Sequence, residues 1–193
     1  MGTNASIEFP RVEKPPRKVS IQTFLRKYVK GGPGVKYEFN KGAIEKTDSF
    51  GFREQYITYN ILNGFEKTVN AKKRNRIVQA LEVWTSETQL RKPDLAFITL
   101  EQIRQGAEGK EPMPEFIIEV ISKNDPILIV KDKVYEYFKA GLKVLWHVFP
   151  HNQTVEIYRS PQEIEVCSGE QICSAEPTVP GFKIKTQDIF KKP

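Results

Sequence analysis

Cysteine and histidine are scarce in this 193-residue sequence, which has two of each. The cysteines, Cys167 and Cys173, are too few for a disulfide framework and do not form a CxxC pair. The histidines, His147 and His151, supply no convincing third and fourth ligand for a structural zinc ion. The sequence therefore argues against the disulfide-rich and zinc-finger classes, and we expect both cysteines to be ordinary thiols.

Long apolar runs are also absent. No run reaches the roughly 18–20 residues that a membrane-spanning helix needs, and the N-terminal region has no apolar segment typical of a secretory signal. We therefore expect a cytoplasmic protein with no membrane partner. With 39% hydrophobic and 28% charged residues, the composition is that of a globular protein that buries its own core.

The domain organisation follows from a change of pattern near residue 20. Residues 1–19 contain three prolines among charged residues and have no apolar period, which predicts a flexible arm. Residues 20–193 are long enough for a single domain.

Basic residues outnumber acidic ones, 30 to 24, and the resulting net charge of +6 favours a polyanionic partner. The densest basic stretch contains Lys72, Lys73, Arg74 and Arg76. These side chains can neutralise phosphates, which makes them candidates for weak contacts with nucleic acid. The alternative is a solvated loop between two elements.

The periodicity of apolar residues predicts alternating helices and strands after residue 20. A helix over 21–30, capped by Ser20, precedes hairpin strands at 35–39 and 43–45 and a helix of about 15 residues that begins near Phe52. A polar loop over 66–76, β-forming segments at 77–90 and 94–99, and a polar excursion over 101–114 come next. The rest comprises a strand at 115–121, a helix at 130–141 and strands at 142–149, 154–159, 163–167 and 182–185. This order predicts a mixed α/β sheet.

Glu119 is the residue whose charge conflicts with this pattern. It lies within the apolar strand 115–121, where an unpaired carboxylate costs several kcal/mol. Asp94 opens the preceding predicted strand, after Pro93. If the two strands are neighbours, the carboxylates converge, and two oxygen ligands completed by water are the usual minimum for Mg²⁺. The alternatives are a plain Pro-Asp turn for Asp94 and a buried ion pair for Glu119.

Lys133 lies on the predicted helix that follows strand 115–121. It flanks the apolar stripe of that helix, so the lysine side chain can reach back over the sheet. A lysine beside a carboxylate-bound metal can position and help to deprotonate a water, and can neutralise charge on a phosphate. A surface lysine is the alternative.

These residues belong to a larger set of short motifs. The set comprises Lys92-Pro93-Asp94, Ile118 to Ser122, Asp132 to Tyr137, Ala140-Gly141-Leu142, Trp146, Tyr37-Glu38-Phe39 and Pro180-Gly181-Phe182. Taken together, the motifs resemble the Uma-type proteins of the PD-(D/E)XK restriction-endonuclease-like superfamily, which are abundant in bacteria. The resemblance covers nearly everything after residue 20.

The resemblance implies an αβββαβ core with a mixed central sheet, an N-terminal helix and hairpin, and C-terminal strands. It implies that Asp94 and Glu119 bind the metal. Lys133 then replaces the lysine that most superfamily members carry two residues after the glutamate, where this chain has Ile121. Glu38 matches an early motif and is a further candidate for the site, with a surface strand glutamate as the alternative.

The function implied by the resemblance is that of a Mg²⁺-dependent endonuclease, with Mn²⁺ as a substitute, that hydrolyses phosphodiester bonds of nucleic acid, DNA above all. The alternative is a catalytically inactive nucleic-acid-binding or interaction domain that retains the fold. Two departures bear on this choice: the family often has a histidine where this chain has Glu54 or Gln55, and an aspartate where it has Phe149. The sequence leaves open whether the protein forms a homodimer.

Overall fold

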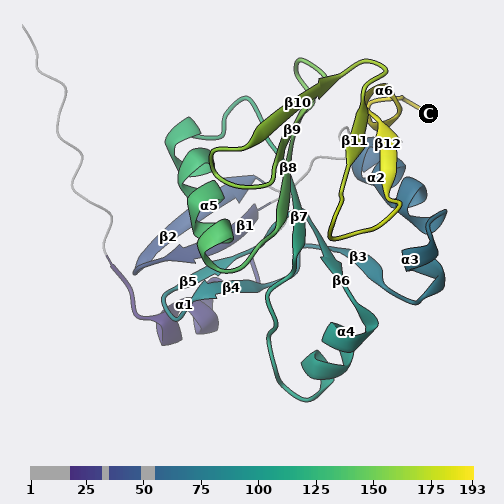
Figure 1. The fold of residues 1–193 in the computed structure, drawn as a ribbon. Helices are drawn as coiled ribbons and strands as arrows, with labels where there is room; N and C mark the ends of the chain where they lie inside the picture. Colours follow the sequence, from purple (N-terminus) through teal and green to yellow (C-terminus); the bar gives the residue numbers. More distant parts are fainter. Residues whose placement is uncertain (1–17, 32–34, 49–54) are drawn as a thin grey trace, which may run out of the picture.

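The protein is built around a six-stranded mixed sheet with helices on both faces (Figure 1). The structure is a computed structural model and describes residues 18–31, 35–48 and 55–193. Residues 1–17 of the predicted flexible arm, 1–19, therefore lie outside the described part.

The six strands follow the spatial order β10-β9-β8-β7-β6-β3. In chain order they are β3 (Arg76–Gln79), β6 (Leu95–Ile98), β7 (Phe116–Val120), β8 (Val144–Phe149), β9 (Thr154–Tyr158) and β10 (Ile164–Ser168). Strands β7 and β8 are parallel, whereas the other neighbours are antiparallel. The predicted mixed α/β sheet is confirmed, and the apolar strand β7 lies in its interior as expected.

Helix α5 (Ile127–Lys139) joins the two parallel strands, which require such a crossover. Its buried residues include Val134 and Tyr137, which pack with Ile117 of β7 on one face of the sheet. They recur at helical spacing, as the apolar period predicts. Among the described residues, the structure has no helix with both the length and the apolar character needed to span a bilayer.

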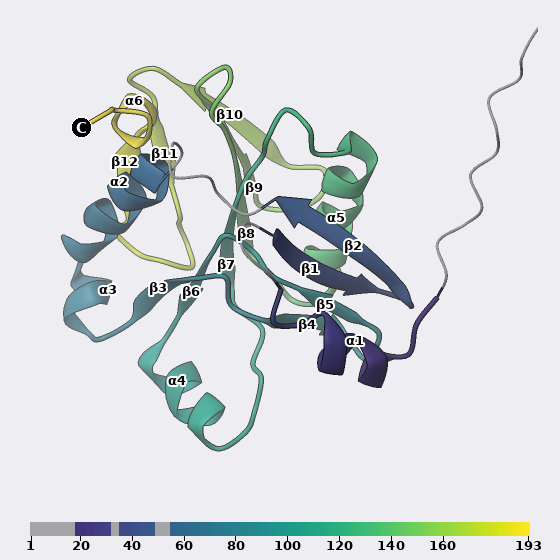
Figure 2. The same ribbon diagram turned by 180° about the vertical axis from the view of Figure 1, so that it is seen from behind.

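Helix α2 (Gln55–Glu66) packs on the opposite face of the sheet, as the two views show (Figures 1 and 2). Ile61 and Phe65 belong to the same core cluster as Phe116 of β7, whose side chain points away from that of Ile117. The predicted start of this helix near Phe52 falls outside the described residues. The order α2, β3, β6, β7, α5, β8 confirms the expected αβββαβ core.

The C-terminal elements cover the same face as α2. They are β11 (Ile172–Ser174), β12 (Lys183–Lys185) and α6 (Thr186–Ile189). The ring of Phe182 stacks on Trp146 of β8 with centroids 5.6 Å apart, and it contacts Phe65 of α2 edge to face. These aromatic contacts fix the C-terminal hairpin against α2.

A second, four-stranded sheet contains the N-terminal hairpin, in the order β2-β1-β5-β4. Its elements are β1 (Val35–Asn40), β2 (Ala43–Asp48), β4 (Val83–Ser86) and β5 (Gln89–Arg91), and α1 (Ile21–Lys27) packs on it. Phe24, Phe39 and Leu90 form its small core. This sheet brings β1 and β5 to the side of the main sheet that carries α5 (Figure 1).

The polar excursion predicted over 101–114 is wrong in its first half, because α4 (Leu100–Ala107) occupies it. Thr99 caps this helix: its hydroxyl accepts a hydrogen bond from the backbone N–H of Gln102, whose side chain accepts one from the N–H of Thr99. The helix has no buried side chain. Leu100, Ile103 and Ala107 nevertheless recur at helical spacing, a short signal within a mostly exposed segment.

Two other segments are more divided than predicted. The expected polar loop over 66–76 contains the short helix α3 (Val69–Lys72). The β-forming segment 77–90 is broken into parts of β3, β4 and β5 by turns, one of them at Ala80, whose φ of 50° cannot continue a strand.

Candidate active site

The two carboxylates singled out in the sequence meet where β6 begins and β7 ends. Strands β6 and β7 are antiparallel neighbours, with Leu95 opposite Ile118, so Asp94 and Glu119 lie one position further along the same ladder. The backbone N–H of Val120 donates to Oδ2 of Asp94 at 2.8 Å, and that of Asp94 to Oε2 of Glu119 at 3.4 Å. The strand pairing on which the predicted convergence depended is therefore present.

Asp94 is bound by a lysine that the sequence did not single out. Nζ of Lys36, on β1, lies 2.7 Å from Oδ1 of Asp94 and 2.8 Å from the carbonyl oxygen of Lys92. Burial and the nearby charge of Glu119 raise the pKa of Asp94 to about 6, although the charge of Lys36 acts in the opposite direction. Asp94 therefore lies in surroundings that disfavour its negative charge.

Glu119 is oriented from α5. The hydroxyl of Tyr137 donates to Oε1 of Glu119 at 2.8 Å, and Nζ of Lys133 lies 3.7 Å from the same oxygen. Burial, together with the charge of Glu119, raises the pKa of Tyr137 well above its usual value. Tyr137 therefore stays protonated and acts as a hydrogen-bond donor to the carboxylate.

Lys133 is held between Glu119 and Glu38. Its Nζ lies 2.7 Å from Oε2 of Glu38, and the residue is only 8% exposed, so the surface-lysine alternative is wrong. Burial lowers the pKa of Lys133, but the charges of Glu119 and Glu38 outweigh burial and raise it above its usual value. Lys133 is therefore an ammonium ion at neutral pH.

Glu38, on β1, has no exposed surface, and the surface-glutamate alternative is also wrong. Burial raises its pKa, but the charges of Lys133 and Arg91 outweigh burial and lower the pKa to about 2. The backbone N–H of Lys92 donates to its second oxygen, Oε1, at 3.0 Å. Glu38 is thus a charged acceptor that holds the Lys133 ammonium group in place.

The low pKa of Glu38 predicts a contribution to the pH dependence of stability. Because the folded-state pKa is about 2 and the usual value is 4.5, this contribution is complete above about pH 4.5 and is lost as the pH falls through about 2. Urea unfolding measured across this window should show a shallower acid slope in Glu38→Gln than in the wild type. The exposed Glu115→Gln is the control, and equal slopes in Glu38→Gln and the wild type would contradict the prediction.

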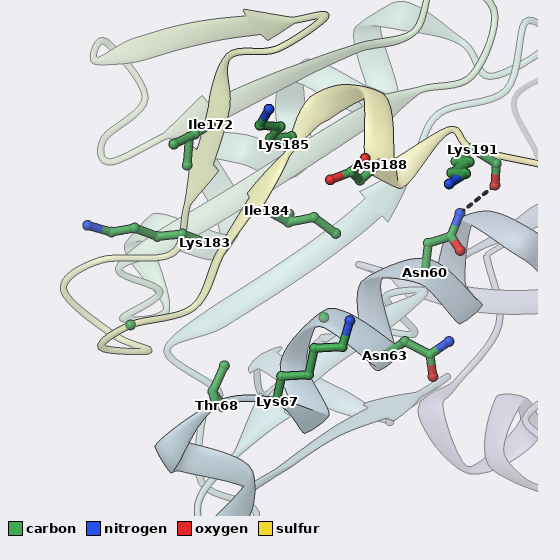
Figure 3. A pocket seen from close by; sticks show the side chains of 12 residues that line it. Asn60, Asn63, Lys67, Thr68, Ile172, Lys183, Ile184, Lys185, Asp188 and Lys191 are labelled. Atoms are coloured by element: carbon green, nitrogen blue, oxygen red, sulfur yellow. Dashed lines mark hydrogen bonds between the residues drawn. The ribbon is translucent and has the colours of Figure 1, made fainter.

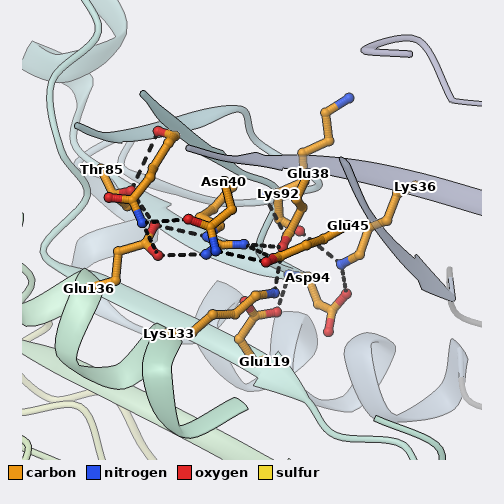
Figure 4. A network of polar contacts seen from close by, with 12 residues as sticks. Lys36, Glu38, Asn40, Glu45, Thr85, Lys92, Asp94, Glu119, Lys133 and Glu136 are labelled. Atoms are coloured by element: carbon orange, nitrogen blue, oxygen red, sulfur yellow. Dashed lines mark hydrogen bonds and ion pairs between the residues drawn. The ribbon is translucent and has the colours of Figure 1, made fainter. Parts of the chain in front are cut away.

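Arg91, on β5, connects Glu38 to two other carboxylates and is 1% exposed. Its Nη1 lies 3.2 Å from Glu38 and also pairs with Glu45 of β2. Its Nε and Nη2 donate to the two oxygens of Glu136 of α5 at 2.8 and 2.6 Å. Figure 4 shows how this network brings side chains of β1, β2 and α5 together. The sequence gave no sign of this buried arginine.

A cavity of about 250 Å³ opens at these side chains. Its lining includes Lys36, Asp94, Glu119, Lys133 and His147. His147 is 1% exposed and lies opposite Glu119 on β8; its Nδ1 has no hydrogen-bond partner among the described residues. Burial lowers its pKa to about 3, so its imidazole is neutral at physiological pH.

The donor set of this cavity suits a hard divalent cation. Asp94 and Glu119 offer carboxylate oxygens, and their mutual repulsion, which raises the pKa of Asp94, would be relieved by a cation. No group of three or more His, Cys, Asp and Glu side chains in the described part of the chain could hold a metal ion. A cation here would therefore use the two carboxylates and take its other ligands from water.

The basic segment lies elsewhere. Lys72, Lys73 and Arg74 are exposed where α3 ends, on the side of the sheet opposite α5 (Figure 2). Arg76 opens β3, and its Nη1 donates to the carbonyl oxygens of Ala71 and Asn75 at 3.3 and 2.8 Å. The structure does not bring this segment to the carboxylates.

The chain resembles known proteins in sequence and in fold. Residues 21–187 match the model of the Uma2 family, described as "Putative restriction endonuclease". A crystal structure from Anabaena variabilis, described as a "putative nuclease belonging to DUF820", is similar with a TM-score of 0.75 and 20% identity over 89% of this chain and 97% of that one. No curated protein matches the chain. Because the family model spans most of the sequence, the chain belongs to the Uma2 family of restriction-endonuclease-like proteins.

Proposed function

We propose that the protein is a Mg²⁺-dependent endonuclease that cleaves DNA, with Asp94 and Glu119 as metal ligands and Lys133 as an electrostatic catalyst. The observation that carries the proposal is the meeting of these three side chains at one cavity of about 250 Å³. Membership of the Uma2 family supports a nuclease-like activity of this kind. Mn²⁺ is expected to replace Mg²⁺, because both are hard cations that accept oxygen ligands.

Each carboxylate has acceptor capacity left for a cation. Oδ2 of Asp94 accepts one hydrogen bond, from Val120, and Oδ1 is bound to the side chain of Lys36. Each carboxylate oxygen carries two lone pairs. The hydrogen bonds from Val120 and Tyr137 hold the two carboxylates in place.

The bound cation would lower the pKa of a water and withdraw charge from the scissile phosphate. Lys133 is protonated, so it does not serve as a general base. Its ammonium group instead donates hydrogen bonds and offsets the negative charge that develops on the phosphate. Glu38 and Arg91 keep this ammonium group in position, 3.7 Å from Oε1 of Glu119.

The test is a metal titration followed by thermal unfolding and by cleavage of plasmid DNA. At ten times its dissociation constant, Mn²⁺ should stabilise the wild type by about 1.4 kcal/mol. The double variant Asp94→Asn, Glu119→Gln should show neither this stabilisation nor cleavage. The exposed Glu115, next to β7, provides the matched control Glu115→Gln, which should behave as the wild type. A wild type that binds no metal would rule out the enzyme.

One observation favours the inactive alternative, a nucleic-acid-binding domain that retains the fold. Lys36 already compensates Asp94 at 2.7 Å, so the site is partly neutralised without a metal. If the domain is inactive, Lys36→Met should neither bind the metal nor cleave DNA. Under the proposed function, the same variant retains metal binding, because the two carboxylates remain.

A further inference from the structure

A second cavity, of about 660 Å³, lies between α2 and the C-terminal elements β12 and α6 (Figure 3). Four lysines line it: Lys67 directly after α2, Lys183 and Lys185 on β12, and Lys191 after α6. We call it the basic groove and define it by these four residues. Its volume is in the range of known ligand sites.

The basic groove is separate from the candidate active site. Helix α2 and the C-terminal elements pack on one face of the six-stranded sheet, whereas α5 packs on the other. Among the residues that the structure describes, none lines both cavities. A ligand in the basic groove therefore does not contact Asp94 or Glu119.

The charge of the basic groove is largely uncompensated. All four lysines are exposed, and none forms an ion pair within the part of the chain that the structure describes. Asp188 is the one acidic residue among the described residues of the lining. An excess of unpaired ammonium groups in a concave surface attracts an anionic ligand, since the concave shape concentrates their field.

The walls of the groove are held in fixed positions. Nδ2 of Asn60, on α2, donates to the carbonyl oxygens of Ile189 and Lys191 at 3.1 and 2.8 Å. Phe182 packs against Phe65 of α2 below. The lysines of the C-terminal wall are therefore kept opposite Lys67 before any ligand binds, which lowers the entropic cost of binding.

We propose that the basic groove binds the phosphodiester backbone of a single strand of nucleic acid, at a site remote from the catalytic cavity. This proposal rests on the proposed function for the nature of the ligand. Lysine is a point charge suited to phosphate. Because lysines stand on both walls, the charged line of one strand fits between them, whereas a duplex carries its phosphates on a convex surface.

Base stacking does not contribute to recognition in the groove, because the described residues that line it include no aromatic side chain. The exposed segment Lys72, Lys73 and Arg74 follows Thr68, a residue of the lining, along the chain and extends the basic surface beyond the cavity. This supports the weak phosphate contacts expected of that segment.

The test is the binding of a short fluorescent oligothymidylate, measured by anisotropy in EDTA over a range of NaCl concentrations. A single strand gives a slope of log affinity against log salt of about 0.7 per phosphate neutralised. The basic-groove variant changes Lys67, Lys183, Lys185 and Lys191 to Gln. The magnitude of its salt slope should therefore be smaller than that of the wild type by about 3, and it should bind at least about 10-fold more weakly at low salt. The control changes Lys27, Lys30, Lys139 and Lys143 to Gln, four exposed lysines that line neither cavity, and should keep the wild-type slope.

Three results would overturn the proposal: no binding by the wild type, an equal slope in the basic-groove variant, or equal affinity for the oligoadenylate–oligothymidylate duplex. Failure of the proposed function is distinguishable from these. The double variant Asp94→Asn, Glu119→Gln should bind the strand as the wild type does, because it leaves the groove intact. A wild type that binds the strand but never cleaves DNA contradicts the endonuclease alone.

Discussion

Replacing Lys133 with methionine should slow DNA cleavage by about 10²–10⁴-fold while metal binding persists. The ammonium group lies 3.7 Å from Oε1 of Glu119, where it can compensate charge on a phosphate at the cavity. The variant should still fold, because Glu38 keeps its contacts with Arg91 and with the backbone of Lys92. Single-turnover cleavage and Mn²⁺ titration by calorimetry, both run well below the unfolding temperature, measure the two effects separately.

Two neighbouring lysines serve as controls. Lys123 is exposed in the turn after β7, and Lys131 donates to the hydroxyl of Tyr158 at 2.7 Å; neither lines the cavity. Lys123→Met and Lys131→Met should therefore cleave at close to the wild-type rate. Full activity in Lys133→Met together with loss of activity in Lys123→Met would contradict the prediction and show that Lys123 holds the catalytic role.

The main sheet and its helices could be predicted because their signals are local. A near-continuous apolar run identified β7 and marked Glu119 as its exception, and helical spacing identified α5. Helix α4 was missed because most of its residues are exposed, but its capping box of Thr99 and Gln102 is visible in the sequence and would have located it.

The second sheet explains what the sequence could not supply. Lys36 and Arg91 reach the site from β1 and β5, whose packing over α5 is a tertiary contact with no local pattern. A weak signal for Lys36 exists: it lies two residues before Glu38, so strand alternation places both on one face. For Arg91 there is none, because a buried guanidinium can be identified only together with its carboxylate partners.

Replacing Arg91 with methionine should lower the free energy of unfolding by about 3–5 kcal/mol, the usual cost of removing one partner from a buried ion pair. Arg91 is 1% exposed and contacts three carboxylates. Within the described ranges, its loss leaves Glu136 and Glu45 with no ion-pair partner and Glu38 with Lys133 alone. The bidentate contact with Glu136 also ties β5 to α5. Urea unfolding at pH 7 measures the change.

Two variants separate this burial effect from a general loss of charge. Arg91→Lys keeps the charge but not the two parallel hydrogen bonds to Glu136, so it should fall between the wild type and Arg91→Met. Arg159 pairs with Glu165 on the surface, and Arg159→Met should cost at most about 1 kcal/mol. If Arg91→Met cost no more than Arg159→Met, Arg91 could not be what holds Glu38, and with it Lys133, in position at the cavity.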